Sequence, residues 1–354
     1  IWFVPAEYAC LCQYDSNMGK VIKFIVLEGA TSIRGTHYNL LKYKNSIVLI
    51  PTRDMNIFIY NIEEEKLHKI CLNGKENTKE KFIAGAVWKH YVYMFPVAYS
   101  KILRVDMENM HVEYINSASV RRCFENGRDY TQICVTIGET ANLLIEDSNK
   151  ICEFDMRTHS EKIISVGDGD ICYKTMCRYG EKGIILSDQR GNIVILNEKK
   201  EQVSYISSDD GVYFNGCIPV MDGYLFLPYK KGFACIYLEG RNRKYIDMEI
   251  KIRESTWANK WAYAPYSRIF YDKKRAIFFN IFNKSMCLLD RETCKVQEKY
   301  IIIDNLEENI KGRLYNEFDR YELMNERGIE PLGLTGFLKY IQSGKYTDRQ
   351  YSTD

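Results

Sequence analysis

The sequence predicts an all-β protein, a seven-bladed β-propeller of four-stranded antiparallel blades with a short C-terminal helical extension. Three observations carry this prediction. A pattern of apolar strands returns seven times along the 354 residues, its internal spacing stays constant, and each repeat is about 42 to 51 residues long. Four short strands fit that length, and four-stranded units stacked radially form a propeller. Counts of six or eight blades also fit, because some repeats are weak.

The most regular part of each repeat is a pair of strands. The first strand is a run of apolar residues, often closed by Pro, and the second ends ten residues later in Asp or Asn, except at Leu238. Closing residues are Pro5, Pro51, Pro96, Ile145, Ser187, Pro228 and Asn280, and the strand ends are Asp15, Asn61, Asp106, Asp155, Asn197, Leu238 and Asp290. Asp or Asn at the strand end is expected to accept hydrogen bonds from amides of the turn that follows.

Further strand-like segments precede these pairs, at residues 38–43, 82–88, 133–137, 173–179, 214–220 and 268–272. We therefore assign residues 1–304 to the propeller. Residues 305–354 differ, because Leu306, Ile310, Leu314 and Phe318 recur at helical spacing. A shorter helical stretch is expected at 337–341. The chain begins at Ile1 inside an apparent strand, so the first repeat lacks its leading strand and upstream residues are expected.

Composition excludes some classes of partner and site. A formal net charge of +2 gives no overall field for nucleic acid or a membrane surface. No apolar run approaches the ~20 residues that span a bilayer, and no signal peptide is visible. These features favour a cytoplasmic protein, and the reducing cytoplasm suits its 12 cysteines. A third alternative is that the chain is one domain of a larger protein whose upstream part carries the activity.

The cysteines are predicted to fill the core. Cys12, Cys152, Cys235 and Cys287 each stand three residues before a strand end, where other repeats have Phe58, Leu103 and Val194. A position shared by Cys, Phe, Leu and Val is an apolar packing position, where free Cys behaves as a small hydrophobe. We therefore predict neither a disulfide framework nor a metal site.

Catalytic and cofactor motifs are absent from the sequence. It contains no nucleophile elbow, phosphate loop or dinucleotide fingerprint, and its five histidines show no metal-ligand spacing. The Gly- and Asp-rich residues 167–170 lack the later ligands of a calcium loop and fit a turn between blades. The sequence thus predicts no cofactor and no metal.

The loops between the second and third strands of the blades are the candidate binding surface, because such loops gather on one face of a propeller. They carry basic and aromatic residues, the types that dominate binding hot spots. The predicted ligand-binding residues are Arg53, Tyr99, Lys101, Arg190, Tyr229 and Lys231. Acidic residues interrupt the basic ones, which disfavours nucleic acid. The leading hypothesis is a non-catalytic scaffold that recognises a protein, peptide or glycan; ordinary solvated loops are the alternative.

An enzyme acting on a carbohydrate or a cyclic peptide, as a lyase or hydrolase, is the rival hypothesis. Its acid and base groups would converge at the channel mouth from different blades, which no local motif reveals. The candidates are Glu7, His37, Asp54, Glu146 and Asp188. A His–carboxylate or carboxylate pair within reach of one another would support this hypothesis.

The repeat resembles those of known bacterial propellers. Residues 1–5 and 14–21 belong to a pattern of a strand, a loop, a strand ending in Asp and a turn with Gly-Lys-Val. This pattern is similar to the repeat of virginiamycin B lyase-like and NHL-like propellers, within the wider group that includes WD40-like repeats. The resemblance extends to about residue 304. For the lyase family it implies a metal centre of His and Glu, which has no counterpart here, so that activity is not carried over.

Overall fold

The structure is a computed structural model. It describes residues 1–4, 9–30, 37–72, 81–97, 99–118, 130–145, 147–207, 214–220, 223–228, 234–239, 242–247, 266–271, 274–280 and 285–300. Contacts divide these residues into two compact units. One unit holds residues 1–4 and 10–26, and the other holds residue 9 and the described residues from 27 to 300.

All the strands belong to antiparallel sheets formed in chain order. The first unit contains the three-stranded sheet β1 (Trp2–Phe3), β2 (Cys10–Asp15) and β3 (Lys20–Val26). The second unit contains six four-stranded sheets. The first three of these are β4 (His37–Tyr43), β5 (Ser46–Pro51), β6 (Asn56–Asn61) and β7 (Lys66–Cys71); β8 (Phe82–Trp88), β9 (Tyr91–Pro96), β10 (Lys101–Asp106) and β11 (His111–Asn116); and β12 (Tyr130–Ile137), β13 (Thr140–Ile145), β14 (Lys150–Asp155) and β15 (Glu161–Ser165).

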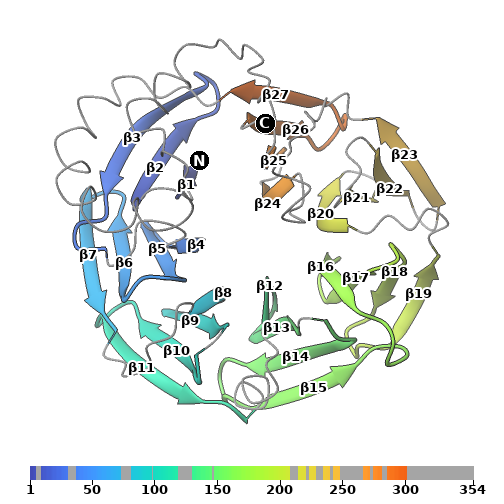
Figure 1. Cartoon of the computed structure of the whole chain (residues 1–354), viewed down its shortest axis with the longest axis horizontal. Helices are drawn as coiled ribbons and strands as arrows, with labels where there is room; N and C mark the ends of the chain where they lie inside the picture. Colours follow the sequence, from blue (N-terminus) through green and yellow to red (C-terminus); the bar gives the residue numbers. More distant parts are fainter. Residues whose placement is uncertain are drawn as a thin grey trace, which may run out of the picture. The chain divides into compact units, whose positions relative to one another are not determined.

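The other three sheets follow the same order. They are β16 (Tyr173–Tyr179), β17 (Gly183–Asp188), β18 (Ile193–Leu196) and β19 (Gln202–Ile206); β20 (Phe214–Val220), β21 (Gly223–Pro228), β22 (Ala234–Glu239) and β23 (Asn242–Asp247); and β24 (Tyr266–Tyr271), β25 (Arg275–Asn280), β26 (Ser285–Asp290) and β27 (Val296–Tyr300). In the second unit, the first strand of each sheet contacts the first strand of the next, in the succession β4, β8, β12, β16, β20 and β24. This is the blade order of a β-propeller (Figure 1).

The predicted strands and sheets agree closely with the structure. Among the described residues, six sheets have the four predicted strands and the sheet of the first repeat has three. The segment 214–220 coincides with β20, and the strand ends Asp15, Asn61, Asp106, Asp155 and Asp290 close β2, β6, β10, β14 and β26. The predicted C-terminal helical extension, residues 305–354, lies outside the described residues.

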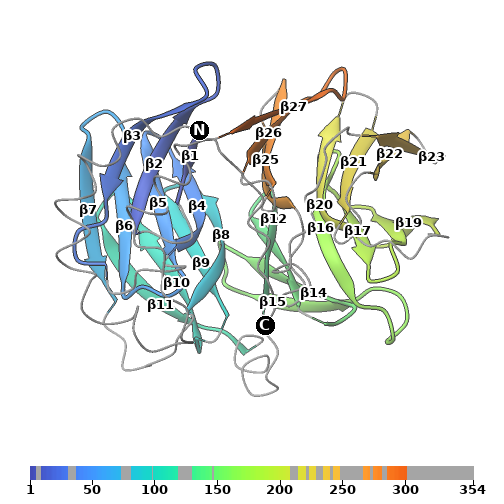
Figure 2. The same ribbon diagram turned by 45° about the horizontal axis from the view of Figure 1, so that its top comes forward.

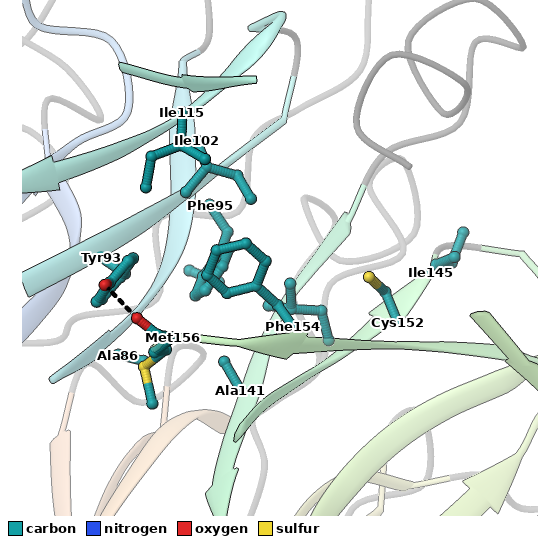
Figure 3. Close-up of a cluster of buried hydrophobic side chains, with 12 residues drawn as sticks. Ala86, Tyr93, Phe95, Ile102, Ile115, Ala141, Ile145, Cys152, Phe154 and Met156 are labelled. Atoms are coloured by element: carbon teal, nitrogen blue, oxygen red, sulfur yellow. Dashed lines mark hydrogen bonds between the residues drawn. The ribbon is translucent and has the colours of Figure 1, made fainter. Parts of the chain in front are cut away.

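The core lies between neighbouring sheets. The second strands β5, β9, β13 and β17 are almost wholly buried, because both of their faces are covered, and this explains their continuous apolar runs. Figure 3 shows one cluster, in which Tyr93 and Phe95 of β9 pack against Cys152 and Phe154 of β14. The Tyr93 hydroxyl donates a hydrogen bond of 2.5 Å to the carbonyl oxygen of Met156.

The shared cysteine position is a core position, as predicted. Its described members are all buried, namely Cys12, Phe58, Leu103, Cys152, Val194 and Cys287. The thiols of Cys10 and Cys12 lie 3.8 Å apart on one strand and are both reduced. Burial raises the pKa of Cys287 to about 12, so this thiol stays protonated at neutral pH. The residues therefore act as apolar packing groups.

The turns between third and fourth strands follow one design. Asp155 Oδ1 accepts hydrogen bonds of 2.8 Å from the amides of Arg157 and Thr158, and the equivalent Asn61 accepts from Glu63 and Glu64. The turn then needs one residue with a positive φ. That residue is Gly19, Glu65, Met110, His159, Lys200 or Cys294 in successive turns. The predicted role of Asp and Asn at the strand end is thereby confirmed.

Candidate functional site

The loops between second and third strands leave each sheet of the second unit at one end. The connections between successive sheets leave at the same end, because the strands alternate in direction. The described loops are residues 52–55, residues 97 and 99–100, residues 147–149, and residues 189–192. We call this set the loop end, and it contains three of the predicted ligand-binding residues, Arg53, Tyr99 and Arg190, while a fourth, Lys101, begins the strand that follows one of these loops.

A buried polar side chain holds the backbone of three of these loops. Asp54 Oδ1 accepts from the backbone amide of Asn56 at 2.8 Å and from its side-chain amide at 3.0 Å. Ser148 Oγ accepts from the amide of Lys150 at 3.2 Å, at the equivalent place in its repeat. In each of these loops the backbone is therefore hydrogen-bonded to a buried side chain.

Asp188 fixes its shorter loop with more hydrogen bonds. Its Oδ1 accepts from the amides of Arg190 and Asn192, both at 2.8 Å, and its Oδ2 accepts from the side chain of Asn192 at 2.7 Å. Asp54 and Asp188 were both proposed from the sequence as acid or base groups. In the structure their carboxylates cap loops, and Asp188 has three donors on it already.

Tyr99 occupies the position equivalent to Asp54 and Ser148, three residues after the end of a second strand. This position points into the sheet interface. The Tyr99 side chain is accordingly 4% exposed, with its ring 5.2 Å from that of Phe82 and 6.3 Å from that of Tyr114. The sequence analysis placed Tyr99 on the surface of the loops, whereas the structure places its ring in the core.

Arg53 and Arg190 are the exposed members of the predicted set. Lys101 begins β10 opposite Asn116 and is half-buried. These three residues belong to three different sheets, and no hydrogen bond joins them in the described part of the chain. Tyr229 and Lys231 lie outside the described residues, as do Glu7 and Glu146.

Neighbouring connections fasten the loops further. The amide of Lys81 donates to the carbonyl oxygen of Thr52 at 2.7 Å, and the Lys81 carbonyl oxygen accepts from Val97 at 2.8 Å, so one residue ties two successive loops together. Gln189 exchanges hydrogen bonds with Cys172 at 2.7 and 2.9 Å and donates to the carbonyl oxygen of Asp170 at 3.1 Å. The loop end is thus held by backbone–backbone and side chain–backbone hydrogen bonds to segments distant in the sequence.

His37 lies against this network, and the structure brings it to Asp54. Its side chain is 3% exposed, and its Nε2 is 3.2 Å from the carbonyl oxygen of Asn56. A carbonyl oxygen only accepts, so Nε2 carries the proton and Nδ1 presents its lone pair. Within the described residues Nδ1 has no hydrogen-bond partner. Burial lowers the pKa of His37 to about 4, and the Asp54 carboxylate opposes this shift.

Lys81 completes the charged groups near Asp54. Burial lowers the pKa of Lys81, and the Asp54 carboxylate opposes that shift too. The site therefore combines a neutral imidazole, a carboxylate at 0% exposure and an ammonium group in a solvent-poor place. Sequence reasoning missed Lys81, Thr52 and Asn56. In the sequence, the one sign that a side chain caps these loops is that Asp54 and Ser148 occupy the same position in their repeats.

The described residues hold no group of three or more His, Cys, Asp or Glu side chains that could bind a metal ion. None of their helices is long and apolar enough to cross a membrane. At the loop end, the exposed side chains of Arg53 and Arg190 can donate hydrogen bonds and pair with negative charges.

No protein-family model and no curated protein matches this sequence. Solved structures do match. The dihydro-heme d1 dehydrogenase NirN, in complex with DHE, is similar with a TM-score of 0.56 at 12% identity, over 84% of this chain and 62% of that chain. The present chain thus spans less than two thirds of NirN. A catalytically inactive virginiamycin B lyase from Staphylococcus aureus with quinupristin has a TM-score of 0.56 at 11% identity, over 75% of this chain and 84% of that chain.

The WD40 repeats of RRP9 are also similar, with a TM-score of 0.51 at 9% identity, over 68% of this chain and 74% of that chain. At such identities a structural likeness establishes the fold alone. The resemblance drawn from the repeat is confirmed at that level: the chain has the β-propeller fold that virginiamycin B lyase and WD40 repeats share.

Proposed function

We propose that this chain is a non-catalytic binding scaffold that recognises a protein, peptide or glycan at the loop end. One observation carries the proposal: Arg53 and Arg190 are exposed on loops whose backbones are fixed from below by buried Asp54 and Asp188. A loop that is already ordered loses less conformational entropy when a ligand binds. Arginine is also enriched among residues that dominate binding energy.

The proposed surface includes the half-buried Lys101 and the predicted residues Tyr229 and Lys231. Tyr99 contributes to it through packing, since its buried ring supports the β9–β10 loop. Exposed Asp147 pairs with Lys174 at 2.6 Å near these loops, so charges of both signs are interleaved. We therefore expect a ligand with both donors and acceptors rather than nucleic acid or an anionic membrane.

The proposal extends to architecture and location. The sheet β1–β3 is taken as the seventh blade, so residues 1–304 make one propeller and 305–354 a helical extension. The chain is taken as cytoplasmic, which suits the free cysteines of the described residues. Structural neighbours include both WD40 repeats and enzymes, so the fold by itself supports scaffolding and catalysis equally.

Binding can be tested without knowing the natural ligand. The full chain would be screened against a phage-displayed peptide library and a glycan array, and the affinity of each hit measured by calorimetry. Arg53→Ala and Arg190→Ala are each expected to weaken binding roughly ten-fold, as for a hot-spot side chain worth about 1.4 kcal/mol.

Arg157→Ala is the matched control, because Arg157 lies in the β14–β15 turn at the opposite end of its sheet and its side chain is 62% exposed. Hits that bind both arginine variants as tightly as the wild type would place recognition away from the loop end. Hits weakened equally by Arg157→Ala would show a general charge effect instead of a site.

An enzyme is the second candidate, and the His37–Asp54 pair favours it. A neutral imidazole with a bare Nδ1 beside a carboxylate is a general-base arrangement. Against it, both side chains are almost fully buried, and Asp54 already caps a loop. Incubation with glycans and with the cyclic peptide quinupristin, followed by mass spectrometry, would test it. Product formation that His37→Gln abolishes would replace the scaffold proposal.

A further inference from the structure

Among the described residues, the last strand of each sheet pairs with another strand along one edge only, and such open edges attract other strands unless they are protected. Charged side chains on the edge are a common protection. Six of the seven last strands described here carry them: β3, β7, β11, β15, β23 and β27. The exception is β19, whose sequence is Gln-Val-Ser-Tyr-Ile.

Three side chains of β19 are exposed, and two of them, Val203 and Tyr205, are large hydrophobic residues. Val203 is 50% exposed and Tyr205 is 52% exposed, and these residues share one face because they are two apart in a strand. An open groove of ≈ 500 Å³ runs along the strand and is lined by residues 202–207. β18 pairs with the other edge of β19, which forms the outer edge of its sheet in both views (Figures 1 and 2). A β-branched residue and an aromatic residue thus stand together on an uncharged edge.

This strand is complementary to itself. If two copies pair antiparallel about a two-fold axis at Ser204, then Val203 of one copy faces Tyr205 of the other, twice. Pairs of an aromatic and a β-branched residue stabilise neighbouring strands, whereas like charges placed opposite each other destabilise them.

We propose that β19 is a self-association surface, at which a second copy of this chain adds its own β19 antiparallel and joins the two sheets into one. A two-fold interface of this kind is closed, so it makes a dimer and no longer assembly. The proposal is independent of the loop end, which lies in the loops between second and third strands.

The oligomeric state of the full chain, followed by sedimentation over a range of concentrations, tests the proposal first. The wild type is expected to move toward twice the monomer mass as concentration rises. Val203→Lys and Tyr205→Lys should each abolish the shift, since each places a charge on the edge and both positions are exposed enough to accept it. Far-ultraviolet circular dichroism would confirm that both variants fold.

Cross-linking tests the register. The Ser204→Cys substitution places a thiol opposite its own copy, where antiparallel partners have Cα atoms ~4.5 or ~5.5 Å apart, within the ~4.4–6.8 Å of disulfides. Mild oxidation should therefore link Ser204→Cys chains as dimers. Gln202→Cys, which would face Ile206 of the other copy, should stay at the background set by the native cysteines.

Three results would overturn the proposal. A chain that is monomeric at all concentrations has no self-association surface, even if β19 captures an extended peptide of another protein. A dimer that persists in both lysine variants must form through an interface other than β19. Linking of Ser204→Cys and Gln202→Cys to the same extent would show random collisions.

Discussion

His37, Thr52, Asp54 and Asn56 are polar residues around the β5–β6 loop, and solvent reaches almost none of their surface. A polar group in such a place costs free energy unless it is hydrogen-bonded, and a buried charge costs more. Asp54 has donors from Asn56, whereas Nδ1 of His37 lacks a partner among the described residues. Burial therefore disfavours the protonated form of the His37 ring.

Acid should destabilise the fold through His37. Its pKa falls from 6.5 to about 4 on folding, chiefly because the ring is buried. Between these values the unfolded chain binds a proton that the folded chain does not, so stability is full above pH 6.5 and decreases as pH falls toward 4. The loss can reach about 3 kcal/mol. Urea unfolding at pH 7.5 and pH 5 measures it.

His37→Leu should reduce the difference between the two pH values, because it removes the buried imidazole. His111→Gln is the control, since His111 is exposed and its loss removes a histidine without removing a buried group. An equal pH dependence in wild type and His37→Leu would contradict the assignment.

Gly85 illustrates close packing between neighbouring sheets. A Cβ atom there would lie 2.6 Å from Ile50 Cδ1, 2.7 Å from Leu41 Cδ1 and 2.8 Å from the carbonyl oxygen of Tyr93. The backbone oxygen cannot move away easily. Gly85→Ala should therefore destabilise the fold by roughly 1–3 kcal/mol, the usual effect of overpacking.

Gly169→Ala is the matched control, because a Cβ atom at Gly169 would meet nothing within 4 Å. It should be neutral or slightly stabilising, since Ala reduces the freedom of the unfolded chain. Thermal unfolding midpoints of both variants test this prediction. Equal midpoints would show that the packing around β8 adjusts to the added methyl group at Gly85 without loss of stability.

At the scale of an element, the third-to-fourth-strand turn combines a capping Asp or Asn with one residue of positive φ. Among the six residues of positive φ that the described turns of this kind contain, only Gly19 is a glycine; the others include Glu65, Met110 and Lys200. Non-glycine residues pay a steric cost in that conformation. The capping hydrogen bonds offset this cost, which explains why Asp or Asn recurs at the strand ends while glycine does not recur in the described turns.

Asp155→Ala should destabilise the fold by roughly 1–2 kcal/mol, because it removes two hydrogen bonds to a charged group. Burial raises the pKa of Asp155, but the amides of Thr158 and Arg157 outweigh burial and leave the pKa below 3.8. The carboxylate thus contributes stability above pH 3.8, and this contribution is lost as pH falls further.

Asp155→Asn should retain most of the stability, since Asn61 and Asn197 serve at the same position in other turns. Chemical unfolding at neutral pH compares the three proteins. If Asn proves as costly as Ala at Asp155, the charge rather than the hydrogen-bond geometry holds the turn.

At the scale of the second unit, polar contacts from these turns link successive sheets. His159 lies in the β14–β15 turn, and its Nε2 is 3.3 Å from Arg104 Nη1 and 3.3 Å from the Tyr93 hydroxyl oxygen, both in the preceding sheet. Lys200, in the β18–β19 turn, forms an ion pair of 3.2 Å with Glu153 of β14. Arg104 and Glu153 are equivalent in the repeat, two residues before Asp106 and Asp155. In these two turns the residue of positive φ therefore contacts the same repeat position of the preceding sheet.

Glu153→Gln should destabilise the fold by roughly 1–3 kcal/mol, because the Lys200 side chain is nearly buried and would lose its charge partner. The charge-swapped double variant Glu153→Lys with Lys200→Glu should recover much of the loss. Glutamate suits the positive φ of that position, as Glu65 shows.

Lys182→Gln is the control, because the Lys182–Glu198 pair is exposed on both sides and such pairs contribute little. Urea unfolding of the four proteins measures the difference. A swapped variant no more stable than Glu153→Gln would mean that the contact acts through packing and not through charge.

Repetition made most of the fold readable from the sequence. Strand positions, capping residues and the core cysteine position recur at a constant spacing, and each depends on local hydrogen bonds or on burial of one strand between two sheets. Such features repeat wherever the strand pair repeats. The sequence therefore determined the propeller class, the strand ends and the apolar role of the cysteines.

The loop end and the β19 edge depended on tertiary structure. Tyr99 stands in a loop, where no period of two or 3.6 indicates which way a side chain points, and only the sheet interface decided that it is buried. The approach of His37 to Asp54 joins residues from different elements through Asn56. Exposed Val203 and Tyr205 likewise became notable only once β19 was seen to end its sheet. Local sequence specifies hydrogen bonds between near neighbours, whereas long-range packing decides which side chains remain accessible.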